Sequence, residues 1–381
     1  MGVGVPPLSL YVHIPWCVRK CPYCDFNSYR APEALPEGRY LSALLRDLEV
    51  EATRVPDRPL TSIFFGGGTP SLFSGAAIAA LLKGIERTLP LGRCLEVTLE
   101  ANPGAVDAER FAEYRRAGVN RLSIGVQSFR DRMLDRLGRV HDRRDAGRAF
   151  ASARAAGFDD INLDLMYGLP GDTPDGALED LEQALELGPA HISWYQLTLE
   201  PGTAFARRPP RLPSDEEIVA VEEAGRARLA AAGYVRYEVS AYARDGRQCR
   251  HNSNYWAFGD YLGIGAGAHG KLTLDDRSII RTAKQRNPNT YVDTVGQASA
   301  AQIERIDSRP QIALEYLMNA LRLVVGTPTD EFERRTGQSR DAIAAPRREA
   351  ERRDWMRTDP ARLVATPAGL QRLNGLLMLF C

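Results

Sequence analysis

The expected fold follows from the stretch Tyr11-Val-His-Ile-Pro-Trp-Cys17-Val-Arg-Lys-Cys21-Pro-Tyr-Cys24-Asp-Phe26. Residues 8–14 are rich in β-forming side chains and Pro15 ends the run, which predicts a strand followed by a loop. Three cysteines lie on that loop at a C-x3-C-x2-C spacing, so one loop can direct three thiolates at one centre. A [4Fe–4S] cluster held by three cysteines leaves one iron open to another ligand. The residues predicted to hold such a cluster are Cys17, Cys21 and Cys24.

Two other chemistries use cysteines at short spacing. Zinc is the first, because His13 can complete a Cys3His set with the three thiolates. A disulfide framework is the second, but six cysteines in 381 residues are too few and too clustered for a secreted disulfide scaffold. The spacing alone leaves zinc open, and residues further along the chain favour the cluster.

Composition limits the classes of partner. The chain has 49 basic and 49 acidic residues, so no overall field attracts nucleic acid or an anionic membrane. No run of about 18 apolar residues occurs, and the first residues lack the basic region of a signal peptide. We expect a cytoplasmic protein with at most peripheral membrane contact.

Residues 8–240 alternate strand-like and helical patterns. After the first strand, strands are predicted at residues 61–65, 95–100, 121–127, 161–166 and 191–199. Polar or glycine-rich residues follow the strands, as in Gly66-Gly-Gly-Thr-Pro70 and Asn102-Pro-Gly104. Six such repeats predict a (β/α)6 partial TIM barrel with its site at the carboxyl ends of the strands. The alternative, an open doubly wound sheet, lacks its G-x-G-x-x-G turn here.

The pattern changes after the barrel, and three domains are predicted. Residues 1–240 form the barrel, and residues 241–308 are expected to be a loop-rich connection with dense glycines at 259–270. Residues 309–381 read as three helices and a short β-wing, which resembles a winged-helix module. Its arginines at 347–357 alternate with acidic residues, which is typical of a solvated helix face, so we expect no nucleic-acid partner.

Five motifs together resemble a known family. They are Tyr11-Val-His-Ile-Pro-Trp-Cys17, Phe65-Gly-Gly-Gly-Thr-Pro-Ser71, Glu100-Ala-Asn-Pro103, Ser123-Ile-Gly-Val-Gln-Ser-Phe129 and Asn162-Leu-Asp-Leu-Met166. Their order and content resemble the radical S-adenosylmethionine (radical-SAM) superfamily, and within it the oxygen-independent coproporphyrinogen III oxidase branch. The resemblance implies a [4Fe–4S] cluster whose open iron chelates the amino and carboxylate groups of S-adenosylmethionine (SAM).

The same resemblance implies which residues line the SAM pocket. They are Tyr11, Gly67, Gly68, Thr69, Glu100, Gln127, Arg139 and Asp164. Elementary chemistry agrees with the charged members of this set. Arg139 can pair with the methionine carboxylate, while Glu100 and Asp164 suit cationic or hydroxyl groups of the nucleoside.

Two departures narrow the resemblance. The oxidase pattern has a fourth cysteine where this chain has Phe26, and residues 250–256, Arg-His-Asn-Ser-Asn-Tyr-Trp, fit an H-N-x-N-Y-W signature. Both features resemble the HemW-like heme chaperones of this branch. That resemblance implies heme binding and delivery to apo-haemoproteins such as respiratory enzymes, with cluster and SAM in a structural or regulatory role that includes a possible homodimer. The alternative is an enzyme that decarboxylates coproporphyrinogen III oxidatively.

His251 is the candidate heme ligand in that signature, because imidazole is a common axial ligand of heme iron. Tyr255 and Trp256 can stack on a porphyrin face. Cys249, two positions earlier, and His269, between glycines, are further candidates for a second ligand. No catalytic residue is assigned: the chaperone resemblance implies a protein that is not an enzyme, with a radical-SAM oxidoreductase of the coproporphyrinogen III dehydrogenase type as the alternative.

Overall fold

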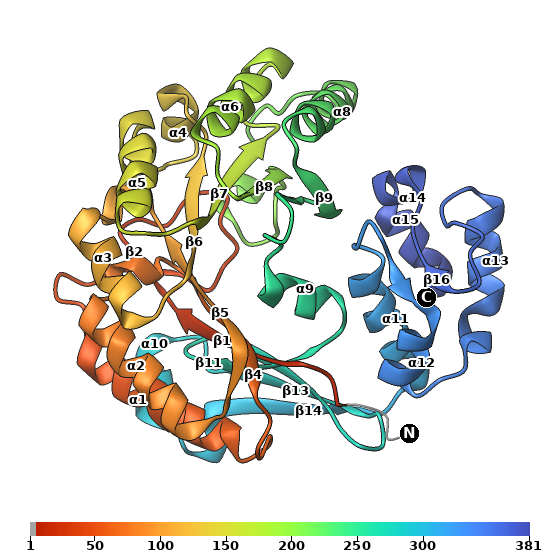
Figure 1. Ribbon diagram of the computed structural model, residues 1–381, viewed down its shortest axis with the longest axis horizontal. Coiled ribbons are helices and arrows are strands. Elements are labelled where there is room, and N and C mark those ends of the chain that lie inside the picture. Colours follow the sequence, from red (N-terminus) through yellow and green to blue (C-terminus); the bar gives the residue numbers. More distant parts are fainter. Residues whose placement is uncertain (1–4) are drawn as a thin grey trace.

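The computed structural model describes residues 5–381 and contains a strongly curved sheet with helices on its outer side (Figure 1). Six strands run parallel as direct neighbours, in chain order, as the sequence predicted. These are β1 (Leu8–Ile14), β4 (Leu60–Gly67), β5 (Leu91–Ala101), β6 (Arg121–Gln127), β7 (Asp160–Tyr167) and β8 (His191–Gln196). The connecting helices are α1 (Glu37–Ala52), α2 (Gly75–Thr88), α3 (Ala108–Ala117), α4 (Asp131–Arg136), α5 (Arg143–Ala155), α6 (Pro174–Leu187), α7 (Ala204–Arg207) and α8 (Asp215–Ala231). The (β/α)6 partial barrel is confirmed.

Side-chain alternation explains how each strand serves two surfaces. In β1, Leu10 and Val12 are fully buried in the core cluster that also contains Tyr40 and Leu44 of α1. Tyr11 and His13 alternate with them and face the inside of the curve. Local sequence also determines where helices begin. The Ser214 and Glu217 side chains form a reciprocal capping box at the start of α8. The outer core therefore fixes the strands, and the inner positions are free to carry polar groups.

The predicted loop-rich connection over residues 241–308 was wrong. That segment contains β10 (Ala241–Ala243), α9 (Arg250–Trp256), β11 (Asp260–Ile264), β12 (His269–Thr273), β13 (Ile279–Lys284), α10 (Pro288–Thr294) and β14 (Ala301–Ile306). Strand β11 pairs in parallel with β1, and β12 to β14 continue antiparallel. At the opposite edge β9 (Val235–Glu238) pairs with β10, giving one sheet in the order β14-β13-β12-β11-β1-β4-β5-β6-β7-β8-β10-β9.

The glycines that suggested loops have a different purpose. A Cβ on Gly263 would lie 2.0 Å from the carbonyl oxygen of His269, and one on Gly270 would lie 2.5 Å from the Thr282 hydroxyl. Gly265 has a φ of 104° and approaches the carbonyl of His13. These glycines let neighbouring strands and side chains approach closely; Gly263 and Gly270 belong to strands of the sheet, and Gly265 belongs to the turn that follows β11.

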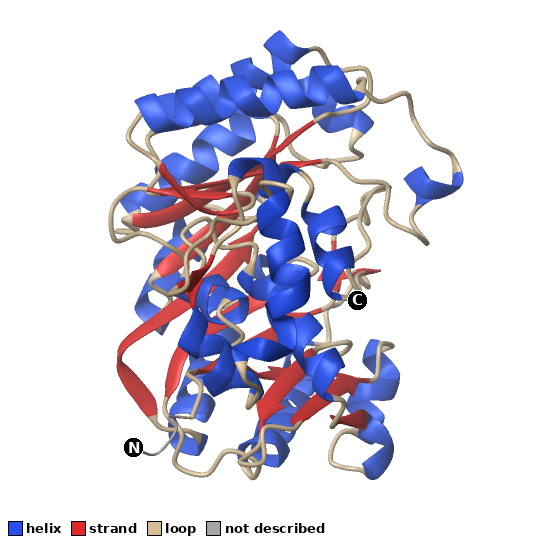
Figure 2. Cartoon of the chain, turned by 90° about the vertical axis from the view of Figure 1, so that its right-hand side faces the viewer, coloured by secondary structure: helices blue, strands red, loops and turns tan. Residues whose placement is uncertain are grey.

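The C-terminal segment has its own small core. It comprises α11 (Arg309–Ala320), β15 (Thr327–Pro328), α12 (Thr329–Thr336), α13 (Ala344–Arg352), β16 (Arg362–Leu363), α14 (Pro367–Gln371) and α15 (Leu373–Leu377). Tyr316 and Phe332 pack in a cluster with Phe258 and Ile279, which joins this segment to the sheet. The wing was predicted at residues 355–366, which contain β16 and an isolated antiparallel bridge between Met356 and Ala365, whereas β15, the partner of β16, lies earlier in the chain. When the molecule is viewed from the right-hand side of Figure 1, the C-terminal helices lie in front of the strands (Figure 2).

Helix α9 lies inside the curve of the sheet, between the strands and the C-terminal segment (Figure 1). It contacts β1, β4 and β11. Across residues 5–381, no helix combines the length and apolar character needed to cross a membrane.

Candidate functional site

A cavity of about 350 Å³ opens at the carboxyl ends of the parallel strands. It is lined by the three cysteines and by nearly all residues predicted for the SAM pocket: Cys17, Cys21, Cys24, Gly67, Gly68, Thr69, Glu100, Gln127, Arg139 and Asp164. Tyr11 lies beside the cavity rather than on its wall, with its hydroxyl 3.0 Å from Nδ1 of His13. The structure therefore brings one thiol-rich wall and one wall of charged and amide groups together around a single space.

The cysteine loop is held by its own backbone and by the turns that follow β11 and β13. The Lys20 ammonium donates to the carbonyls of Phe26 and Ser28, at 3.0 and 3.2 Å. The Asn27 amide donates to the carbonyls of Ala266 and Arg286, both at 2.9 Å. The thiols are thus presented from a braced loop, which suits a group that needs fixed ligands.

The thiols fit a cluster better than a single ion. Within residues 5–381, no three His, Cys, Asp or Glu side chains converge on one metal-ion position. Three thiolates of a [4Fe–4S] cluster each bind a different iron, so a wider spread is what that group requires. Both ring nitrogens of His13 are engaged, by Tyr11 and by the carbonyl of Asn27 at 2.9 Å, so the fourth ligand of the zinc alternative is already occupied.

Burial controls the protonation of these thiols. It raises the pKa of Cys17 and of Cys24, so both are protonated thiols at neutral pH in the metal-free chain. Binding of iron would displace these protons, which couples loading of the site to pH.

The glycine turn after β4 packs against the cysteine loop. Gly68 donates its N–H to the carbonyl of Ile14, and a Cβ there would lie 2.6 Å from the carbonyl of Trp16. Gly67 has a φ of 112°, and a Cβ there would lie 2.5 Å from the His13 ring. The absence of side chains at these two positions therefore admits the cysteine loop at Gly68 and the His13 ring at Gly67.

Two buried carboxyl groups, Glu100 and Asp164, line the cavity. Burial, and then the nearby Asp164, raise the pKa of Glu100 to about 8. Burial also raises the pKa of Asp164, although Asn162 and Ser123 donate hydrogen bonds to it at 2.8 and 3.0 Å. Such a pair is stabilised by a bound cation, and SAM carries a sulfonium and an ammonium group. These residues fit SAM.

Arg139 brings a positive charge to the same cavity. Its Nη2 donates to the carbonyl of Gly125 at 2.6 Å, and its Nη1 lies 3.8 Å from the Cys21 sulfur. Its Nε is buried and has no hydrogen-bond acceptor. Gln127 lies close by at a φ of 69°, and its side-chain amide oxygen accepts a hydrogen bond from the Tyr195 hydroxyl at 2.8 Å. An unsatisfied guanidinium donor beside the cavity fits a carboxylate ligand.

Three residues of the inner barrel were not predicted from the sequence as site residues: Tyr195, Ser123 and Asn162. Tyr195 and Ser123 line the cavity, and Asn162 lies behind Asp164 and also bonds to His191, at 2.6 Å. The alternation of side chains along a strand could have identified them, because each points to the same inward face as a predicted site residue of its own strand or of the neighbouring strand. They orient the residues that face the cavity.

The residues of the H-N-x-N-Y-W signature lie elsewhere. His251 is in α9, is only 9% exposed, and its ring lies 5.0 Å from that of Phe64 inside the barrel. Its Nδ1 is 3.1 Å from the Ser62 hydroxyl, which itself donates to Ser9. Nδ1 is therefore the donor, and Nε2 keeps its lone pair. Burial lowers the pKa of His251 to about 4, which keeps the ring neutral.

The neighbours of His251 differ in accessibility. Cys249 is fully buried, its thiol donates to Glu96, and burial raises its pKa to about 12. Trp256 is covered by the Arg322 guanidinium, 4.3 Å from its ring. Tyr255 is exposed. The structure therefore separates the SAM-type cavity from the signature helix, which packs toward the amino ends of β1 and β4.

Comparisons with known proteins agree with this architecture. Residues 11–185 match the Radical SAM superfamily, and residues 307–372 match the HemN C-terminal domain. The solved coproporphyrinogen III oxidase (HemN) from Escherichia coli, a radical SAM enzyme, superposes with a TM-score of 0.83 at 24% identity, covering 99% of this chain and 90% of that one. This likeness shows a shared fold.

In sequence, the chain is more similar to a second group of proteins than to this oxidase. The chain is 48% identical over 378 residues to the heme chaperone HemW of Escherichia coli, covering 99% of both chains. It is 51% identical over 343 residues to the heme chaperone HemW of Haemophilus influenzae, covering 89% of this chain and 88% of the relative. Since these identities extend over nearly the whole length, the chain belongs to the HemW family of the radical SAM superfamily.

Proposed function

We propose that this protein is a heme chaperone, which binds heme and delivers it to apo-haemoproteins such as respiratory enzymes. The names of its relatives support the proposal, and one structural observation carries it. His251 of α9 holds a neutral imidazole whose Nδ1 donates to Ser62, so its Nε2 lone pair is directed away from that bond and suits heme iron.

In this proposal the cavity holds a [4Fe–4S] cluster and SAM. Cys17, Cys21 and Cys24 would each bind one iron, and the cluster supplies an open iron for chelation of SAM. Arg139 would then pair with the carboxylate, while Glu100 and Asp164 would face cationic or hydroxyl groups. The position of the missing fourth cysteine is taken by Phe26, which lies at the mouth of this cavity and is 57% exposed.

An anaerobic heme titration tests the proposal. Wild-type protein is expected to show a saturable Soret band near one heme per chain, and His251→Ala to shift or lose that band because the iron loses its imidazole. His141→Ala is the matched control, since His141 is equally buried but its Nε2 bonds to the carbonyl of Val126. Absence of a saturable band in the wild type would exclude the chaperone.

The completeness of the cavity favours a second candidate, oxidative decarboxylation of coproporphyrinogen III. Incubation with that substrate, reductant and SAM separates the two functions. Release of carbon dioxide with a two-carboxylate product identifies the enzyme, and unchanged substrate alongside normal heme binding identifies the chaperone.

The residue Gln127 offers a test of the SAM site. Gln127→Asn keeps a side chain that tolerates positive φ but withdraws the amide from Tyr195. We expect SAM affinity to fall roughly tenfold, about 1.4 kcal/mol, as for loss of one hydrogen bond to a charged ligand. Iron content should not change. Gln302→Asn, on the exposed strand β14, is the control, and equal SAM affinity in both variants would remove Gln127 from the site.

The binding of SAM should depend on pH through Glu100. Its raised pKa of about 8 means that the carboxyl must lose a proton before it can pair with a cation. The apparent dissociation constant is therefore expected to fall about tenfold per pH unit as pH rises toward 8, and to level off above it. Equilibrium dialysis at several pH values measures the slope. A Glu100→Gln variant should show no slope, and a wild type without one would contradict the assignment.

A further inference from the structure

The five histidines of the chain differ sharply in accessibility. His269 is exposed, and its ring makes no hydrogen bond within residues 5–381. The other four are buried: His13, His141, His191 and His251. A heme that arrives from solution meets an accessible imidazole before a buried one, and in this fold that condition singles out His269.

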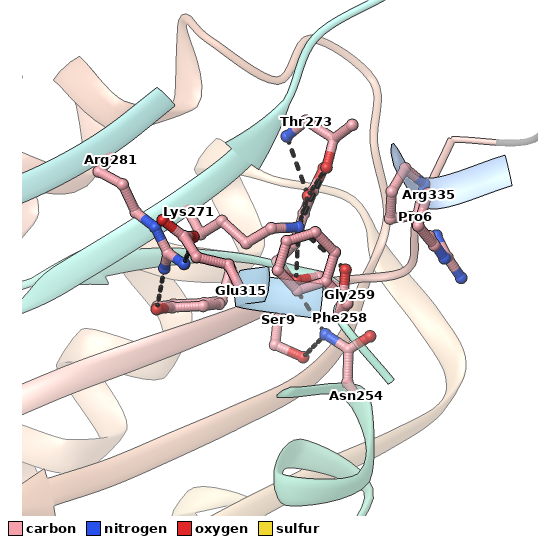
Figure 3. Close-up of polar contacts among 12 residues, drawn as sticks. Pro6, Ser9, Asn254, Phe258, Gly259, Lys271, Thr273, Arg281, Glu315 and Arg335 are labelled. Atoms are coloured by element: carbon pink, nitrogen blue, oxygen red, sulfur yellow. Dashed lines mark hydrogen bonds and ion pairs between the residues drawn. The ribbon is translucent and has the colours of Figure 1, made fainter. Parts of the chain in front are cut away.

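His269 begins β12 on the inner face of the sheet. In the pairing of β12 with β13, Lys271 lies opposite Arg281, and in the pairing with β11 it lies opposite Tyr261. Since alternate residues share a face, His269 lies on the same face as these three. Arg281 donates to the Tyr261 hydroxyl at 3.1 Å, and Figure 3 shows its side chain beside Lys271.

Helix α9 packs against this inner face of the sheet. The ring of Tyr255, an exposed member of the H-N-x-N-Y-W signature, lies 5.2 Å from that of Tyr261. Lys271 holds the end of the same helix in place, because its ammonium donates to the carbonyls of Phe258 and Gly259 (Figure 3). An exposed histidine and an exposed tyrosine of the signature therefore border one aromatic, basic wall.

The charges around His269 complement a porphyrin with two carboxylates. Burial, Arg281 and Arg286 lower the pKa of His269, so its ring is neutral and keeps a lone pair at neutral pH. Arg281 also pairs with Glu315 of α11, whereas Arg286 is exposed and has only the Asn27 amide oxygen as a side-chain partner, at 3.3 Å. Arg286 is thus the freer cation for a propionate.

We propose that His269 is the receiving ligand for heme iron, on the inner face of β12 and β13 beside Tyr255, with Arg286 and Arg281 next to the propionates. This inference rests on the proposed chaperone function and adds to it the ligand that the heme meets first. His251 remains the buried ligand on α9, whereas Cys249, with no exposed surface, is not a ligand in this fold.

Hemin titration of the cluster-loaded, full-length protein tests this assignment. His269→Ala is expected to bind heme at least tenfold more weakly with a shifted Soret band, while its thermal unfolding stays that of the wild type because the side chain is exposed. Free imidazole should restore the wild-type spectrum, since it can enter the vacated exposed position. That rescue distinguishes loss of a ligand from a general structural effect.

Two arginine variants supply the matched comparison. Arg286→Ala should weaken heme binding severalfold, whereas Arg305→Ala should not, because Arg305 pairs with Ile280 and so lies on the opposite face of the sheet. Wild-type affinity and spectrum in His269→Ala, or no rescue by imidazole, would overturn this inference while leaving the chaperone function intact. Absence of heme binding by the wild type would overturn both.

Discussion

Replacement of Cys21 by alanine is expected to abolish the brown absorption of the anaerobically reconstituted protein and to lower its iron content from about four per chain to a small fraction of one. Two remaining thiolates hold a cluster poorly. The same loss is expected for Cys17→Ala and Cys24→Ala, which line the same cavity. Iron and sulfide analysis with the visible spectrum measures it.

Cys94→Ala provides the control for this experiment. Cys94 is exposed and does not line the cavity, so its removal should leave iron, sulfide and spectrum unchanged. Full iron content in any variant of the cysteine loop would remove the cluster assignment. Zinc in place of iron in the wild type would restore the zinc alternative.

The second large effect concerns stability. Lys271 is buried, and its ammonium donates to Asp260 at 3.1 Å and Thr273 at 3.0 Å besides two carbonyls at the end of α9 (Figure 3). It also lies 4.0 Å above the ring of Phe258. Lys271→Ala leaves the buried carboxylate of Asp260 with Arg58 as its remaining cation. We expect the free energy of unfolding to fall by about 3–5 kcal/mol.

Urea unfolding near pH 7 measures this loss. Lys83→Ala, at an exposed position of α2, is the control and should change stability by less than about 0.5 kcal/mol. The double variant Lys271→Met with Asp260→Asn should recover much of the loss, because it removes both buried charges. A Lys271→Ala protein as stable as the Lys83→Ala protein would show that this ion pair contributes little.

The parts of the molecule that sequence predicted well depend on local rules. The strand before Cys17 and the strands ending at Gly67, Ala101 and Gln127 were visible because apolar runs ended at polar or glycine-rich turns. Parallel strands place those ends at one edge, so the location of the cavity followed from the fold, whereas its individual residues came from the family resemblance. Nothing local distinguishes Tyr11, which lies behind the wall, from residues that line it.

Residues whose roles depend on distant partners were harder to predict. Dense glycines near Gly263 indicated loops, because the strand that each must approach is not evident from the sequence. The signature around His251 indicated a heme ligand, but only the position of α9 inside the barrel shows that the ring is buried beside Phe64. Accessibility of His269 likewise depends on the strand pairing of β12.

The pairing of β1 with β11 has a consequence for biosynthesis. Leu8 aligns with Asp260 and Val12 with Ile264, so the strand that precedes the cysteine loop gains its second neighbour only after ribosomes have made most of the chain. Until then an apolar strand, Leu-Ser-Leu-Tyr-Val-His-Ile, has one unpaired edge, which is the kind of surface that nucleates aggregation. Nascent chains interrupted before residue 260 should therefore be insoluble, and the protein should depend on uninterrupted translation more than its barrel alone suggests.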